Sequence, residues 1–224
     1  MEKLFRRKPT GKPIDDPVIH SQEKTGYDCT LLRSDVPWER EETYYTTRDF
    51  DRTDRSYHKH CGPTAITNLL LTLARRRGHD ELKAKPPEEL FAAVAAIGRR
   101  RFTYWNIRDD VPLGGTSYVL LMGYVHACLQ RFGLGRTKLS GRLAATPREM
   151  ARELRKGSLL ILSLYHHRYY GSHIVVACGV AEVRVPGRAA PRLYLKVADG
   201  WVRRPRYIAA EDLPRGGYVA VHLQ

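Results

Sequence analysis

The clearest periodic pattern in the chain predicts a helix that starts near Cys61. Apolar residues recur there at positions i, i+3, i+4 and i+7, namely Ile66, Leu69, Leu70 and Leu73. This spacing puts one apolar stripe on a core-facing helix. Pro63 suits the first turn, where a missing N–H costs nothing, and the basic run that ends at Gly78 is typical of a helix C-terminus.

Three more helices are expected before the pattern changes. One should start at Pro86-Pro87-Glu88-Glu89 and stop at Gly98. Another should be capped by Thr116 and run to about Gly133. Its apolar stripe comprises Tyr118, Leu121, Met122, Val125 and Leu129. A short third helix should start with a capping box at Thr146 and end after Leu154.

Short apolar runs rich in β-branched residues follow, separated by glycine, proline and charged turns. They predict strands at Ser158–Tyr165, His173–Val183, Leu193–Ala198 and Tyr218–Leu223. Helices come first and strands second, which indicates an α+β fold with a mostly antiparallel sheet packed on the helical half. We expect residues 1–56 to form an extended, partly disordered arm whose aromatic residues pack on a domain of residues 57–224.

The composition is that of a single-domain globular protein. A chain of 224 residues suits a single domain, and 42% hydrophobic with 28% charged residues is ordinary for a globular protein. No run approaches the roughly 18 apolar residues that span a bilayer, and the charged N-terminus resembles no signal peptide, so we expect a cytoplasmic protein without membrane contact.

The formal net charge of +14 raises the possibility of an anionic partner. The basic runs lie in loops and at element ends, without a nucleic-acid-reading motif, so a solvated surface is favoured over nucleic acid binding. A nucleic-acid-associated protein stays an alternative, and its affinity would fall steeply with salt. The four cysteines lack metal-ligand spacing, so we expect free thiols, no zinc site and no cofactor.

Cys61 is the candidate nucleophile. At the start of a helix, backbone N–H groups and the positive end of the dipole favour a thiolate and can also donate to an oxyanion. The alternative is a small buried cysteine that only packs, which suits Cys128 and its neighbour His126. Around Cys61, the following Gly-Pro and the preceding His58 and His60 favour a site.

His173 and Asp199 are its candidate partners. His173 opens a strand whose alternation puts Cys178 on the opposite face, so Cys178 is assigned to the core. An imidazole base needs a third group that fixes its tautomer, and Asp199 ends the next strand. Trp201 would shield the pair from water. Asp199-Gly200 could equally be a plain turn, but Cys, His and Asp together favour a site.

These residues resemble a known family. His60-Cys61-Gly62-Pro63-Thr64-Ala65, Gly171-Ser172-His173-Ile174 and Val197-Ala198-Asp199-Gly200-Trp201 are similar to motifs of papain-like cysteine peptidases, nearest the branch of bacteriocin leader-processing peptidases. The resemblance covers residues 57–223. It implies a papain-like fold, cleavage of a peptide or amide bond through a thioester, and a peptide or protein substrate. In that reading Cys61 is the nucleophile, His173 the general acid and base, and Asp199 the orienting carboxylate.

One departure concerns the oxyanion donor. Family members commonly carry a glutamine shortly before the nucleophile, whereas residues 55–60 contain none. His58, His60 or Tyr57 could supply the donor, or the N–H of Cys61 could act nearly alone. A papain-fold protein of weak or no activity that binds peptides or a protein partner is therefore the alternative function. Candidate contacts to substrate are Trp105, Arg168, Tyr169, Tyr170 and Trp201.

Overall fold

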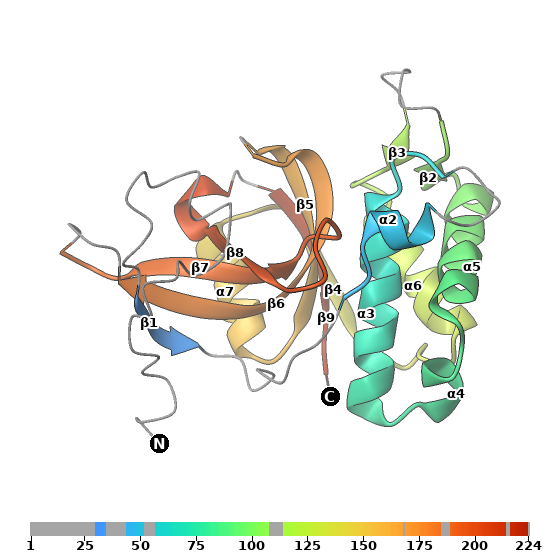
Figure 1. Cartoon of the computed structure of the whole chain (residues 1–224), viewed down its shortest axis with the longest axis horizontal. Coiled ribbons are helices and arrows are strands. Elements are labelled where there is room, and N and C mark those ends of the chain that lie inside the picture. The colour runs from blue at the N-terminus through green and yellow to red at the C-terminus, as the bar shows by residue number, and fades with distance from the viewer. Residues whose placement is uncertain are drawn as a thin grey trace.

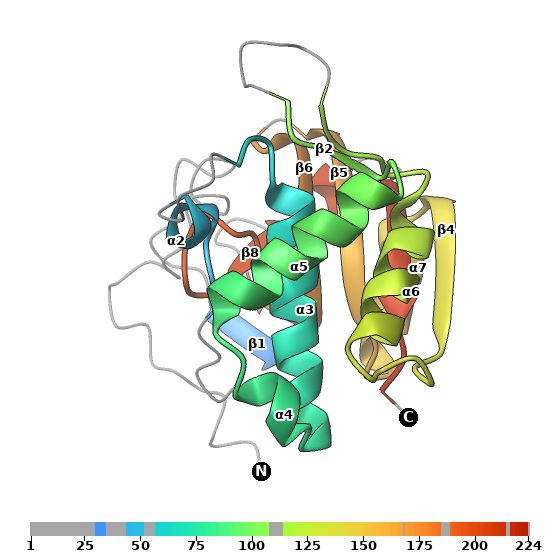
Figure 2. The same ribbon diagram turned by 90° about the vertical axis from the view of Figure 1, so that its right-hand side faces the viewer.

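The computed structural model describes residues 30–34, 44–51, 57–107, 114–167, 169–184, 189–213 and 216–223. Helices and an antiparallel sheet lie side by side as two parts of one body (Figure 1). Turned by 90°, the three longest helices of the helical part stand in front of the sheet (Figure 2). The α+β class expected from the sequence is confirmed.

The helices are α2 (Thr47–Phe50), α3 (Cys61–Arg77), α4 (Asp80–Lys83), α5 (Pro87–Arg100), α6 (Leu121–Arg131) and α7 (Pro147–Arg155), with a 3-10 turn η2 (Ala210–Asp212). The strands are β1 (Thr30–Ser34), β2 (Tyr104–Trp105), β3 (Gly115–Thr116), β4 (Leu139–Ala145), β5 (Leu159–His167), β6 (Gly171–Arg184), β7 (Arg192–Ala198), β8 (Arg206–Ala209) and β9 (Gly216–Val221). Within these residues, no helix has the length and apolar character to cross a membrane.

The main sheet has seven strands. Its order is β4-β9-β5-β6-β7-β8, and β1 pairs with the end of β6. All pairings are antiparallel, so β6 connects the two halves of the sheet through β5 on one side and β7 on the other. β2 and β3 form a separate hairpin over the start of α3 (Figure 1).

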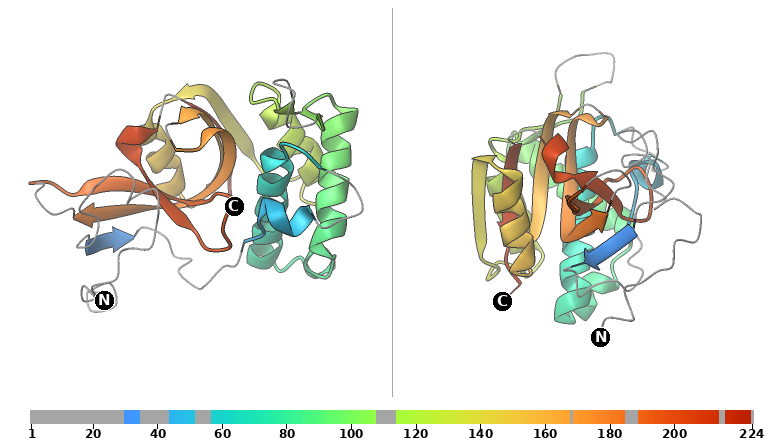
Figure 3. Two further views of the ribbon diagram at one scale, coloured as in Figure 1. Left: turned by 45° about the horizontal axis from the view of Figure 1, so that its top comes forward. Right: turned by 90° about the vertical axis from the view of Figure 1, so that its left-hand side faces the viewer.

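Both faces of the sheet are buried, which explains why its strands read as continuous apolar runs. Leu159 and Ile161 belong to the core that also contains the helices α3, α5 and α6. Leu160 and Leu162 belong to a second core, with the helix α7 on the other side of the sheet. Figure 3 shows α7 within the curve of the sheet, away from α3. Successive side chains of β5 therefore pack alternately into two different cores, one on each face of the sheet.

The helix α3 is buried on all sides and not along a single stripe. Every residue from Gly62 to Ala74 is buried, so its polar residues need internal partners. The Thr67 hydroxyl donates to the carbonyl of Pro63 at 2.9 Å. The Asn68 amide pairs with both main-chain groups of Tyr45, each at 2.8 Å. The expected C-terminus is confirmed, since Gly78 is left-handed at φ 65°.

Two helix boundaries differ from the expectation. The helix expected from Thr116 begins at Leu121, because Thr116 is in β3 and packs on α3. Tyr118 and Met122, expected in its apolar stripe, are half exposed. Gly98 does not end α5, which continues to Arg100. A Cβ at Gly98 would lie 2.7 Å from the Tyr124 ring, so this glycine provides room for packing.

The four predicted strands are confirmed to within two residues at each end, and five strands (β1, β2, β3, β4 and β8) were not predicted. β4 is a sheet edge whose residues are mostly exposed, so it carries no apolar run. β8 has only four residues. The capping box at Thr146, which starts α7, is confirmed by the reciprocal contacts with Glu149.

Part of the expected N-terminal arm lies on the body. The segment 44–51 buries Tyr44 and Phe50 in the helical core, and β1 adds to the sheet. The N–H of Tyr44 donates to the carbonyl of Arg203, and that of Thr47 to Gly200, both at 2.8 Å. Other calls on the arm, including Tyr27 and Trp38, fall outside the described residues.

Position 62 requires glycine, because the Thr116 side chain lies close to its backbone. A Cβ there would lie 2.1 Å from the Thr116 hydroxyl oxygen. We expect Gly62→Ala to lower the free energy of unfolding by about 1–3 kcal/mol, measured by chemical denaturation, because the hairpin must shift. Gly123→Ala in α6 is the matched control, since no heavy atom lies within 4 Å of its Cβ position, and it should not destabilise. Equal losses in both variants would contradict this explanation.

Candidate active site

Cys61 is the first residue of α3, and its side chain is half-buried. The N–H groups of this first turn have no acceptor within the helix. The main-chain N–H groups of Gly62 and of Ile174 in β6 bind the sulfur of Cys61. The side chain of His173, also in β6, hydrogen-bonds the same sulfur. The thiol thus sits where the helix and the sheet meet.

His173 is buried near the start of β6, opposite Leu164 of β5. Its Nε2 donates to the main-chain carbonyl of Asp199 at 2.6 Å. A carbonyl only accepts, so this bond puts the proton on Nε2 and leaves Nδ1 for the sulfur of Cys61. One imidazole therefore connects the thiol to the turn after β7.

The electrostatics of the pair favour charge separation. Burial alone would raise the pKa of the Cys61 thiol, but the hydrogen bond and charge of His173 outweigh it, and the net pKa lies below the ordinary value. Burial would lower the pKa of His173, and Cys61 reverses this so that the net pKa is raised. The two opposite shifts favour the thiolate–imidazolium form of the pair more than in the two isolated side chains.

The Asp199 side chain makes other contacts than the one expected. Its carboxylate accepts from Arg206 at 2.9 Å, from the Tyr170 hydroxyl at 3.0 Å, and from the N–H groups of Trp201 and Val202 at 2.9 and 3.2 Å. The sequence motifs predict that this carboxylate orients the imidazole. In the structure the contact with His173 comes from the main-chain carbonyl of the same residue.

Two aromatic rings enclose His173. The Tyr170 ring stacks on the imidazole with centroids 5.6 Å apart and planes at 5°. The Trp201 indole lies 5.0 Å from the imidazole and is 40% exposed, so it lies between His173 and solvent. Tyr170 was a candidate for substrate contact, but it is buried within this cluster.

The histidines before the nucleophile have other described partners. His60 is buried, lies 3.1 Å from the Asp51 carboxylate and contacts the Tyr57 and Phe91 rings. The main chain of His58 is held by the side chains of Asn106 and Tyr104. These contacts support the loop that enters α3. The main-chain donors described next to the sulfur are the N–H groups of Gly62 and Ile174.

Exposed apolar side chains border the site on the helical side. Trp105 lies on the β2–β3 hairpin, whose Thr116 packs on the first turn of α3. The Tyr118 ring is 6.1 Å from that of Tyr165, which follows the residue paired with His173. Arg168, a further candidate for substrate contact, lies outside the described residues. Trp105 and Trp201 are thus the candidate contacts on the surface.

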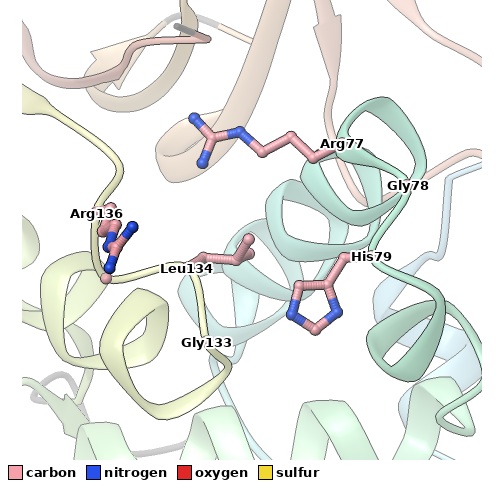
Figure 4. A pocket seen from close by; sticks show the side chains of 7 residues that line it. Arg77, Gly78, His79, Gly133, Leu134 and Arg136 are labelled. Atoms are coloured by element: carbon pink, nitrogen blue, oxygen red, sulfur yellow. The ribbon is translucent and has the colours of Figure 1, made fainter.

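Other possible sites are separate from this one. A pocket of about 540 Å³ lies between the end of α3 and the segment after α6, lined by Arg77, His79 and Arg136 (Figure 4). It is a full helix length from Cys61, roughly 25 Å at 1.5 Å per residue. The described residues hold no group of three His, Cys, Asp or Glu side chains that could bind a metal ion.

The arrangement can perform nucleophilic chemistry on a carbonyl, because it combines a thiol of lowered pKa, an imidazole with a fixed tautomer and adjacent N–H donors. No model of a known protein family matches the sequence, and no curated protein does. The function is therefore argued from these contacts.

The pH dependence of Cys61 alkylation by iodoacetamide, followed by mass spectrometry, tests the pair. His173 lowers the pKa of Cys61, so the wild type should label well below the pH at which an ordinary thiol reacts. His173→Ala should raise this pKa and slow labelling at pH 6 by tenfold or more, since one pKa unit is about tenfold in thiolate.

Cys128 provides an internal control. It is buried in α6, and burial raises its pKa, so it should stay unlabelled in the folded protein at every pH tested. Identical labelling profiles of Cys61 in the wild type and His173→Ala would show that no ion pair forms.

Proposed function

We propose that this protein is a papain-like cysteine hydrolase that cleaves a peptide or amide bond. The observation that carries the proposal is the buried imidazole of His173, hydrogen-bonded to the Cys61 sulfur and also to the carbonyl of Asp199. A nucleophile, a base and a group that orients the base make up the minimum for this reaction. The resemblance of three sequence motifs to papain-like peptidases agrees with it.

In the proposed first step, the thiolate of Cys61 attacks the substrate carbonyl carbon and a carbon–sulfur bond forms. The carbonyl π electrons move to oxygen, which accepts from N–H groups at the start of α3. His173, as imidazolium, gives its Nδ1 proton to the leaving nitrogen while the carbon–nitrogen bond breaks. An amine departs and a thioester to Cys61 is left.

In the second step, neutral His173 takes a proton from water at Nδ1, and the oxygen of that water attacks the thioester carbonyl. The carbon–sulfur bond breaks, which releases a carboxylic acid and regenerates the thiolate and imidazolium. The bond from Nε2 to the Asp199 carbonyl persists through both steps, so the ring keeps its orientation.

The oxyanion site of the proposed enzyme uses main-chain donors. The sequence lacks an upstream glutamine, and His60 is turned inward toward Asp51, so the proposed oxyanion donors are main-chain N–H groups. Loss of one side-chain donor costs roughly 10²–10³ in rate in well-studied hydrolases. We therefore expect slow turnover and a long-lived thioester.

The proposal is tested with a pool of synthetic peptides and mass spectrometry of both products and protein. The wild type should release cleaved peptides and carry an acyl group on Cys61. Cys61→Ala should lose cleavage by about 10⁴-fold or more while keeping its thermal midpoint, because the nucleophile is removed without loss of core packing.

Cys178→Ala is the matched control. Cys178 is a buried cysteine of β6 that forms no disulfide, and this variant should keep its cleavage activity. Peptide retention by wild type and Cys61→Ala alike, with no acyl adduct and no product, would contradict a hydrolase and indicate the alternative of a peptide-binding protein.

A further inference from the structure

We propose that Arg206 and Tyr170 are positioning residues of the active site, which hold Asp199 so that its main-chain carbonyl fixes the orientation and tautomer of His173. This inference rests on the hydrolase function proposed above. It assigns a role in catalysis to two side chains that the sequence motifs do not include. Neither residue would touch the substrate carbonyl.

Four hydrogen-bond donors restrain the Asp199 carboxylate. The side chain is fully enclosed, at 1% exposure for the residue, and Arg206 is buried at 8%. One oxygen accepts from Arg206 and Tyr170, and the other from the N–H groups of Trp201 and Val202. A buried carboxylate with four donors has one stable position.

The position of the carboxylate fixes that of the carbonyl. The two groups belong to one residue, and the peptide plane that carries the carbonyl continues into Gly200. Gly200 is left-handed at φ 73°, and its own carbonyl accepts from the N–H of Thr47. The Asp199–Gly200 peptide is therefore held at both ends, and its oxygen lies 2.6 Å from Nε2 of His173.

The charge of Arg206 also holds the Asp199 carboxylate in place. Arg206 forms an ion pair with Asp199, so the carboxylate near His173 is balanced by a guanidinium. A carboxylate without its arginine would be free to rotate toward the imidazole. This rotation would move the carbonyl. Tyr170 adds a steric restraint, because its ring stacks on the imidazole while its hydroxyl donates to Asp199.

The test compares the labelling pKa of Cys61 in Tyr170→Phe, Arg206→Gln and Arg206→Lys. Tyr170→Phe removes a single oxygen and should raise this pKa and slow alkylation at pH 6 by about tenfold, because one pKa unit is about tenfold in thiolate. Arg206→Gln should have a larger effect. Arg206→Lys keeps the positive charge and should restore most of the wild-type rate.

Arg203→Gln is the matched control. Arg203 lies between Asp199 and Arg206, in the turn after β7. Its side chain is exposed and pairs with Asp49 at 2.6 Å. Its replacement should leave the labelling pKa of Cys61 unchanged. Thermal unfolding of each variant separates loss of the fold from loss of position.

The outcomes separate this inference from the proposed function. A depressed pKa in the wild type that Tyr170→Phe and Arg206→Gln both leave unchanged would overturn the positioning role alone. The same holds if Arg206→Gln unfolds and Tyr170→Phe keeps the wild-type pKa, since Arg206 would then serve the fold. An ordinary thiol pKa for Cys61 in the wild type would overturn the hydrolase proposal itself. A raised pKa in folded Tyr170→Phe supports the positioning role.

Discussion

The contact between the Cys61 thiol and the His173 imidazole joins two parts of the chain that are built in different ways. The thiol comes from a helix buried on every side, and the imidazole from the central strand of a sheet. Neither part can create a reactive sulfur alone: the helix supplies N–H donors and the sheet supplies the base. The packing of α3 against β6 therefore sets the chemistry as well as the stability of the fold.

This dependence explains several features of α3 that would otherwise be costly. A helix with buried threonines and an asparagine must pair each polar group or lose stability. Asn68 pairs with the main chain of Tyr45, and Gly62 admits Thr116 at the first turn. These contacts set the position of the helix start, and with it the position of the sulfur, from two directions.

The sequence predicted the helical half and the three residues that meet at the site better than it predicted how they meet. Periodicity and capping signals located α3 and the start of α7, because these signals are local. Gly98 was misread as a stop, since its role depends on Tyr124, which is distant in sequence. An exposed edge strand such as β4 has no apolar pattern to detect. The order of Cys61, His173 and Asp199 favoured a site, but no pattern distinguishes a carboxylate contact from a carbonyl contact.

The segment 44–51 has a consequence for the whole molecule. Tyr45 is attached to the helical part through Asn68, and the same few residues bind Gly200 and Arg203 on the turn next to His173. The segment thus links the helix α3 to the turn after β7. It lies before residues 57–223, which the sequence motifs cover. A movement of α3 away from this turn would break these hydrogen bonds of the segment 44–51. Residues that precede Cys61 in the chain therefore help to set the distance between its sulfur and the imidazole of His173.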